Sequence, residues 1–259
     1  MTAKEKLVRI VEGAKGDDLE RAIYSFRNFS GVEMEAQHGV SGKSRYEILI
    51  IHKKVANHMS VDNLKSLLVK CGNRKIPSST AIFNMGSASE CESKRLGLCN
   101  AVRCGVKCYA LKAEQCYPGV LPFRVRQAEY WKGIRAIDFI QEFKGINNRK
   151  RKKLKALRFN ESGDFGNQDE LDKAEAIARG LLKEGVIVYC YSSRSDLDYS
   201  GVRSLVVMGS GWYHADISGE AIIIGKKDLV PEGFVECAGS CKVCDLCMKD
   251  GSFIALRKH

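Results

Sequence analysis

The cysteines of this 259-residue chain are the residues whose types and spacing most clearly indicate chemistry. Four of the eleven lie close together near the C-terminus, in "CAGSCKVCDLC", separated by three, two and two residues. Bacterial ferredoxins place thiolates around iron–sulfur clusters with the same gaps in the opposite order, C-x2-C-x2-C-x3-C. The spacing therefore predicts an iron–sulfur cluster of the 4Fe–4S type, held by Cys237, Cys241, Cys244 and Cys247.

Two alternatives remain open for this group. Structural zinc usually takes two C-x2-C pairs a dozen or more residues apart, so four cysteines on one short loop favour zinc less. The first three cysteines also match C-x3-C-x2-C, which is similar to the pattern of radical S-adenosylmethionine enzymes, where three thiolates leave one iron free for the cofactor. Cys247 follows at once and can fill the fourth position. A fully ligated cluster is the simpler interpretation, and S-adenosylmethionine stays a candidate cofactor.

A second group of cysteines lies mid-chain, in "CNAVRCGVKCYALKAEQC" and just before it at Cys91. Gaps of four and three residues match no standard zinc knuckle, but three close cysteines and a distant one would hold a second cluster. Sharing of ligands between the two groups is the other possibility. The expected ligands are Cys99, Cys104 and Cys108; ordinary buried thiols are expected at Cys71, Cys116 and Cys190.

Disulfides are not expected to explain these cysteines. The chain is long enough to bury a core without covalent staples, and the cysteine count is odd and bunched. The opening "MTAKEKLVRIVEGAKGDDLE" lacks the apolar stretch of a signal peptide, and no apolar run approaches a membrane span. We therefore expect a cytoplasmic protein with reduced thiols and no membrane partner. The sequence does not indicate an oligomeric state.

The elements that must position these residues indicate an α/β fold. Residues 1–72 suggest a small N-terminal α+β unit that includes a hairpin and ends in a helix from Ser60 to Gly72. Residues 73–259 are expected to form an α/β domain. From residue 154 continuous apolar strands alternate with an amphipathic helix and further strands, which is typical of a parallel sheet buried on both faces. We expect a partial or full TIM-barrel-like sheet, followed by the C-terminal cysteine cluster.

Polar residues follow these apolar strands directly. Parallel α/β folds bind ligands at the carboxyl ends of their strands. In "NESGDF", Glu161 and Asp164 could hold a cation or an amine and are the candidate catalytic residues. In "YSSRSD", Ser192 and Arg194 are candidates for cofactor binding. Ordinary loop composition is the alternative explanation.

A basic run contributes much of the formal net charge of +11. Such a run can bind phosphate backbones or can be a solvated segment. It makes a nucleic acid a candidate partner, through Arg149, Lys150, Arg151, Lys152, Lys153 and Lys155.

The motifs "FNMGSASEC", "KCYALKAE" and "RFNESGDF", followed by the terminal cysteines, resemble the phage gene-product-88-like family over roughly residues 80 to 250. The resemblance implies a bacteriophage or prophage origin, and thus the cytoplasm of a bacterial host. It also implies metal-binding cysteines at Cys99, Cys104, Cys108 and the C-terminal group. The family is largely uncharacterised, so it implies no reaction.

Three functions are consistent with these observations. The first is an iron–sulfur protein with one or two clusters, acting as a redox or radical-SAM-like enzyme on an unknown substrate. The second is a nucleic-acid-binding protein whose clusters are structural or redox-sensing. The third is a zinc-stabilised phage accessory protein that binds a host protein. Zinc without iron in the purified protein would distinguish the third function from the first two.

Overall fold

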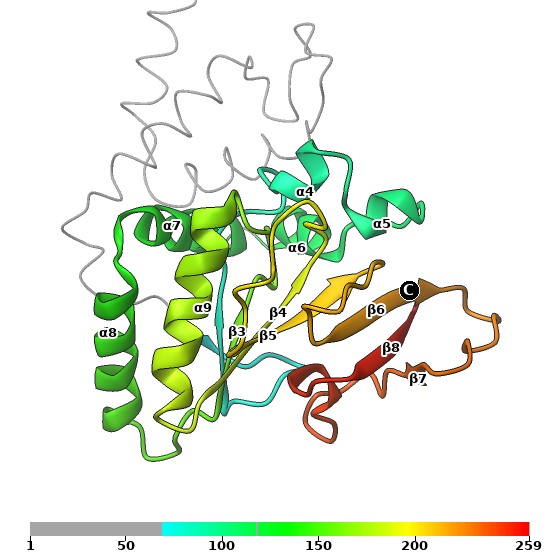
Figure 1. The fold of residues 1–259 in the computed structure, drawn as a ribbon. Helices are drawn as coiled ribbons and strands as arrows, with labels where there is room; N and C mark the ends of the chain where they lie inside the picture. Colours follow the sequence, from blue (N-terminus) through cyan, green and yellow to red (C-terminus); the bar gives the residue numbers. More distant parts are fainter. Residues whose placement is uncertain (1–68, 118, 259) are drawn as a thin grey trace, which may run out of the picture.

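The computed structural model describes residues 69–117 and 119–258. Within this part of the chain the strands form one eight-stranded sheet of order β1-β2-β3-β4-β5-β6-β8-β7 (Figure 1). Neighbouring strands are parallel except for β1 and β2, which are antiparallel. The predicted α/β class is confirmed. The strands are β1 Lys70–Cys71, β2 Thr80–Phe83, β3 Ala156–Phe159, β4 Ile187–Ser192, β5 Leu205–Ser210, β6 Gly219–Ile224, β7 Val235–Glu236 and β8 Ser252–Arg257.

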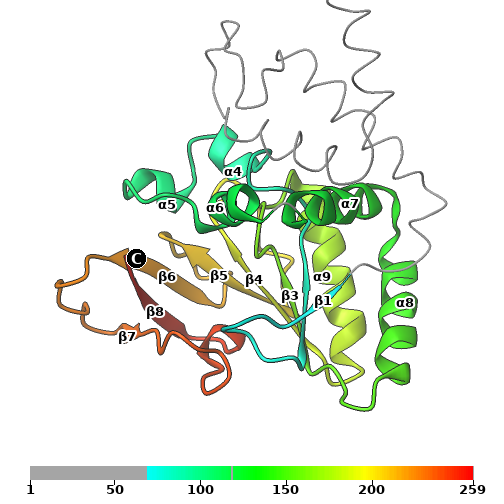
Figure 2. The same cartoon turned by 180° about the vertical axis from the view of Figure 1, so that it is seen from behind.

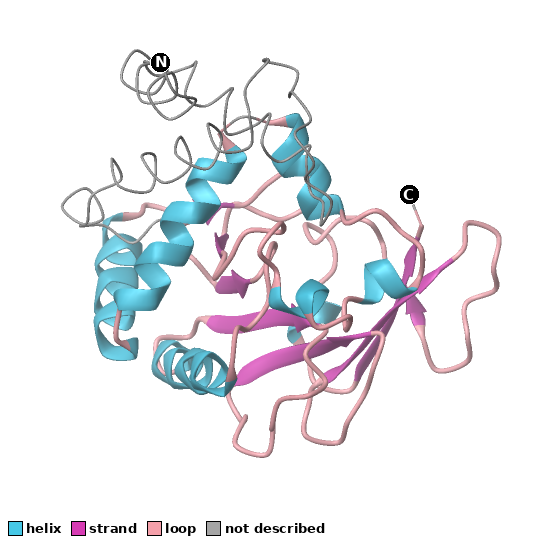
Figure 3. Cartoon of the chain, turned by 90° about the horizontal axis from the view of Figure 1, so that it is seen from above, coloured by secondary structure: helices cyan, strands magenta, loops and turns pink. Residues whose placement is uncertain are grey.

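The helices lie in two places. The three short ones and α7 (Val120–Gly133) lie across the end of the sheet where β2, β3 and β4 finish, and α8 (Ala136–Arg149) and α9 (Gln168–Leu182) run beside the strands (Figures 1 and 2). Seen from above, most helices lie to one side of the strands (Figure 3). The bounds are α4 Glu92–Arg95, α5 Asn100–Arg103, α6 Tyr109–Cys116, α7 Val120–Gly133, α8 Ala136–Arg149, α9 Gln168–Leu182 and the 3-10 helix η2 Leu246–Met248.

The core fills the space between the sheet and the long helices. Because side chains alternate along a strand, Val188 and Cys190 of β4 point into this core, whereas Tyr189 and Tyr191 lie on the other face. In β3, Leu157 and Phe159 belong to the core and Arg158 does not. One face is therefore apolar and covered by helices. The other carries polar side chains and is contacted by η2, which touches β4, β5 and β8.

The expectation of a full barrel is wrong, because the described sheet stays open, with β1 and β7 at its edges. Helices α4 to α8 connect β2 to β3, and α9 connects β3 to β4. The connections after β4 and β5 contain no helix. A TIM barrel needs a helix after every strand to build its outer ring. As in a barrel, strands β2 to β6 lie side by side in the order in which they occur in the sequence.

Several local predictions can be compared with the structure. The helix expected to reach Gly72 is wrong at its end, since Lys70–Cys71 is a strand paired with β2. The predicted domain boundary thus falls between two hydrogen-bonded strands; the rest of the N-terminal unit lies outside the described residues. Helix α9 buries its expected face except Leu182, which is 50% exposed because the helix ends there.

Candidate functional site

The loops after β2 and β3 interlock at the carboxyl edge of the sheet. The Asn84 side chain accepts a hydrogen bond from the Ser162 backbone N–H (2.8 Å), and Asn160 accepts one from Met85 N–H (3.2 Å). Gly163 has a positive φ of 75°, and a Cβ there would lie 2.8 Å from the Gly86 carbonyl oxygen. Glycine is therefore required at Gly163 both by conformation and by space. This contact fixes the position of the "NESGDF" loop.

Asp164 is a buried carboxylate that ties three loops together. Ser93 Oγ donates to Oδ2, as does the Ser193 backbone N–H at 2.8 Å, while Ser192 Oγ donates to Oδ1 at 2.8 Å. The Phe165 N–H also donates to Oδ1 (2.9 Å). Burial raises the pKa of Asp164, and these donors oppose that shift by favouring the carboxylate. Its oxygens are occupied within the protein, so the geometry indicates a positioning role.

Glu161 lies at the same edge but faces the polar face of the sheet. Its Oε1 accepts a hydrogen bond from Asn73 Nδ2 (2.6 Å), and its Oε2 lies 3.9 Å from the Arg124 guanidinium. Its side chain is 16% exposed. The Tyr109 hydroxyl donates to the Glu161 backbone oxygen (2.8 Å). Of the two predicted catalytic carboxylates, Glu161 is the more accessible.

Ser192 and Arg194, the predicted cofactor-binding pair, are both buried and both bonded within the protein. Ser192 donates to Asp164. Arg194 forms two hydrogen bonds to the Asp196 carboxylate (2.7 and 2.8 Å) and one to the Phe165 carbonyl. The structure brings Ser192 and Asp164 together as expected, but as parts of one polar network that joins the strand ends.

Three of the mid-chain cysteines lie at the starts of short helices. Cys91, Cys99 and Cys108 each occupy the residue immediately before a helix, α4, α5 and α6 respectively. The Cys91 thiol lies within electrostatic range of the other two thiols and of Asp164. Burial, followed by the Asp164 charge, raises the pKa of Cys91 to about 12. Cys104 instead points back along α5, with Sγ 3.2 Å from Asn100 Oδ1.

The C-terminal cysteines lie against the polar face of the sheet. The Cys237 backbone N–H donates to Ala255 O in β8 (2.9 Å), and that of Cys241 donates to Lys75 O in the β1–β2 turn (2.9 Å). The Tyr191 hydroxyl donates to Cys247 Sγ (2.7 Å). The Cys241 thiol lies within electrostatic range of both Cys237 and Cys244. Figures 1 and 2 both place this segment beside the sheet end that carries the β1–β2 turn.

The segment that carries the C-terminal cysteines differs from the rest of the described chain in how little of it is buried. Residues 225–251 contain no buried side chain, and Leu229 and Val243 are 91% and 81% exposed. The four cysteines are all partly buried. The partly buried side chains of this segment are mainly its four thiols and four apolar groups, Val230, Phe234, Leu246 and Met248. The centre of the Phe234 ring lies 5.5 Å from that of Phe253 in β8, so apolar packing holds the segment only at its surface.

Arg158 of β3 lies on this face of the sheet and was missed by sequence reasoning. Its guanidinium lies 5.3 Å from the centre of the Tyr191 ring, and its Nε is buried without a hydrogen-bond partner. Burial disfavours its charge, but the Tyr109, Tyr189 and Tyr191 hydroxyls and Glu161 raise the pKa of Arg158 above its ordinary value. Arg158 is also an electrostatic neighbour of Cys241 and Cys247. The sequence feature that could have identified Arg158 was its position as a charged residue inside an otherwise apolar strand.

The donor set of the C-terminal loop fits a thiophilic metal centre. It offers four thiols, a hydroxyl donor to one sulfur and a buried cation that would offset a negatively charged cluster. Among the described residues, no three cysteine, histidine or acidic side chains are already gathered as a metal-coordinating group. Of the thiols expected to be ordinary, Cys190 is buried, Cys71 is partly buried and Cys116 is exposed.

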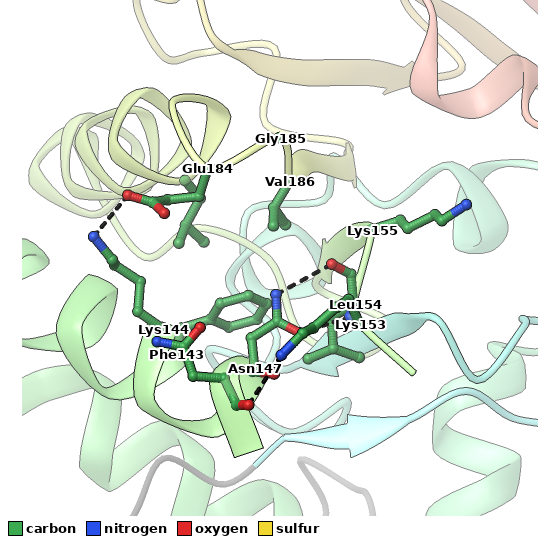
Figure 4. A pocket seen from close by; sticks show the side chains of 11 residues that line it. Phe143, Lys144, Asn147, Lys153, Leu154, Lys155, Glu184, Gly185 and Val186 are labelled. Atoms are coloured by element: carbon green, nitrogen blue, oxygen red, sulfur yellow. Dashed lines mark hydrogen bonds and ion pairs between the residues drawn. The ribbon is translucent and has the colours of Figure 1, made fainter. Parts of the chain in front are cut away.

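The basic run lies at the opposite, amino edge of the sheet, between α8 and β3. Arg149, Arg151, Lys152 and Lys155 are exposed. Lys153 donates to the carbonyls of Asn147 and Asn148 at the end of α8 (3.2 and 2.9 Å), beside a pocket of about 290 Å³ (Figure 4). At the same pocket Lys144 pairs with Glu184 at 2.6 Å (Figure 4). Lys144 and Lys153 of this pocket therefore already form interactions within the protein.

The comparisons with known proteins show a family but no reaction. No helix of the described residues is long and apolar enough to cross a membrane. No curated protein and no solved structure matches the chain, and a similarity to radical S-adenosylmethionine enzymes was not found. The model of the gene product 88 family matches residues 53–207, which include the mid-chain cysteines and "RFNESGDF" but not the C-terminal cysteines. Because this match spans more than half of the chain, the protein belongs to the gene product 88 family.

Proposed function

We propose that this protein is an iron–sulfur protein whose C-terminal loop holds a 4Fe–4S cluster through Cys237, Cys241, Cys244 and Cys247. The observation that carries the proposal is the segment 225–251, which has no fully buried side chain, keeps its four thiols partly buried and places the Cys247 sulfur on the Tyr191 hydroxyl of β4. Metal ligation couples to folding in such segments, because the metal supplies the free energy that a core would otherwise supply. Phage origin and the cytoplasm of a bacterial host accord with the family.

A cluster here would supply electron transfer. The residues around it would adjust its charge and its access to water: Tyr191 donates a hydrogen bond to the Cys247 sulfur, and Arg158 places a buried positive charge on the same face. Glu161 lies close to Arg158 and is partly exposed at the carboxyl edge. A redox or radical-SAM-like enzyme would bind its substrate there, with Glu161 as the group that holds or moves a proton.

The test is metal analysis of anaerobically purified protein, with iron, acid-labile sulfide, zinc and the visible spectrum measured per chain. We expect Cys244→Ser to lose about four irons and four sulfides, as a 4Fe–4S cluster requires. Cys116→Ser is the matched control, since Cys116 is exposed and outside the cluster. Full iron in Cys244→Ser would overturn the proposal. Zinc without iron would support the zinc-stabilised accessory protein instead.

Nucleic-acid binding is the second candidate, because Arg149, Arg151, Lys152 and Lys155 are all exposed on one edge. Phosphate contacts by such residues weaken steeply with salt. A strong salt dependence of DNA or RNA binding that is lost when these four residues become Gln would favour it. The clusters would then be structural or redox-sensing.

A further inference from the structure

The face of the sheet that carries the apolar core continues beyond the helices that cover it. Residues paired in register in a parallel sheet share a face, because side chains alternate along every strand. Val207 of β5 belongs to the core, so Gly209 lies on the same face. The register leads from Gly209 to Glu220 in β6 and on to Phe253 in β8. Helix α9 packs against β4 and β5, and the long helices lie away from β6 and β8 (Figures 1 and 2).

Two further aromatic side chains pack against Phe253 on this part of the face. The centre of the Tyr213 ring, in the connection from β5 to β6, lies 5.0 Å from that of Phe253, with the ring planes inclined at 58°. Phe234, just before β7, lies 5.5 Å away at 77°. Tyr213 is 52% exposed, and the two phenylalanines are partly buried. In such inclined pairs, the ring that contributes its edge keeps its own face free for another group.

Glu220 places a carboxylate without a counter-charge beside these rings. It is partly buried and is the register partner of Phe253 on the neighbouring strand. Within the described part of the chain, Glu220 forms no hydrogen bond or ion pair, whereas Glu236 nearby pairs with Arg257 at 2.6 Å. Burial raises the pKa of Glu220, and no cation of the described residues opposes the rise. A positive group bound here would stabilise the carboxylate.

We infer that Tyr213, Phe234, Phe253 and Glu220 form a binding site for a small organic ammonium ion, on the face of the sheet opposite to the C-terminal thiols. Aromatic ring faces attract cations, and alkylated ammonium groups are the ligands that clusters of such rings recognise. Glu220 supplies the opposite charge. The same carboxylate would repel the phosphates of a nucleic acid, so the cluster favours a cation over a stacked base. The site involves none of the residues proposed to hold the iron–sulfur cluster.

Choline and its neutral analogue, in which carbon replaces the nitrogen, test the inference on the unmodified full-length protein. The two probes have the same shape and differ in charge. In titrations followed by proton NMR, we expect the methyl signals of choline to shift upfield, because ring currents act on groups that lie over aromatic faces. The neutral analogue should bind more weakly. Equal binding of the two probes, or no binding of choline, would overturn the inference.

Two variants with matched controls test the residues. Glu220→Gln should weaken choline binding by about fivefold through loss of the charge, while Glu232→Gln, at an exposed carboxylate outside the cluster, should not. Tyr213→Leu should weaken it by about two- to fivefold, while Tyr117→Leu, at a tyrosine that is 63% exposed elsewhere, should not. Unchanged choline affinity in both Glu220→Gln and Tyr213→Leu would contradict the site.

A single-stranded oligonucleotide provides the opposing test. If it binds better to Glu220→Gln than to the unmodified protein and worse to Tyr213→Leu, the rings are a platform for bases and the inference fails. Iron content should be the same in all four variants as in the unmodified protein. Choline binding therefore decides this inference and metal analysis decides the proposed function, each without the other.

Discussion

At the scale of single residues, Arg158 links the two ends of the polar face. Its electrostatic neighbours are Tyr109 and Glu161 at the carboxyl edge and Tyr189 and Tyr191 beside the C-terminal thiols. Arg158 is partly buried, its Nε has no hydrogen-bond partner, and Glu161 is the carboxylate among its neighbours, so further negative charge on this face would stabilise it. A thiolate-ligated cluster carries such charge.

Replacing Arg158 therefore gives a prediction about the cluster's reduction potential. Arg158→Gln should lower the potential by an amount on the order of tens of mV, because the more negative reduced state loses a stabilising cation. Protein-film voltammetry measures the shift. Arg158→Lys keeps the charge and should stay near the unmodified value. Equal reduction potentials in the Gln variant and the unmodified protein would mean that the charge of Arg158 does not interact with the cluster.

At the scale of elements, the contact between the β2 and β3 loops depends on two glycines. Gly163→Ala should destabilise the protein by about 2–5 kcal/mol, because left-handed strain of about 1–2 kcal/mol adds to a backbone clash with Gly86. Gly185→Ala is the matched control: its φ is 72°, but nothing lies within 4 Å of the added Cβ. It should lose only the strain part. Urea unfolding compares the two, and equal losses would show that the Gly86 contact has no energetic weight.

The helices and strands also show which parts of the fold could be predicted from the sequence. The apolar runs correctly predicted a largely parallel sheet with helices between its first strands, because β3 to β6 and the long helices show their periods in the sequence. Strands β1 and β7 have two residues each and carry no period. Local spacing favoured Cys99, Cys104 and Cys108 as the mid-chain ligands. The positions of the short helices beside these cysteines depend on hydrogen bonds through Ser93, to Asp164 and to Cys99, a tertiary feature that spacing does not encode.

At the scale of the whole molecule, the structure combines a conventional core with two segments that have little or no apolar core of their own. The core between the sheet and α7 to α9 contains Trp131 and several fully buried phenylalanines. Segments 89–117 and 225–251 have one buried apolar side chain between them, Ala110. Their stability should therefore respond to metal separately from the core.

Removal of metal should show this difference directly. Anaerobic treatment with a strong chelator should increase hydrogen exchange throughout 89–117 and 225–251, while β3, β4 and α9 keep their protection. Mass spectrometry of peptides before and after chelation measures it. The core peptides are the internal control. Unchanged exchange in both segments would mean that metal does not hold them, and global exchange would mean that the core itself depends on metal.

The position of β8 between β6 and β7 has a consequence for biosynthesis. β1 to β6 are neighbours in the order in which the ribosome makes them, so this part of the sheet can assemble as it emerges. The C-terminal cysteines emerge before β8, although Cys237 is hydrogen-bonded to Ala255 of that strand and β7 pairs with it. Cys241 and Cys247 can reach Lys75 and Tyr191 as soon as they emerge, but Cys237 takes its place only once β8 has docked against β6. A cluster held by all four proposed ligands would therefore be completed late, after the chain has left the ribosome.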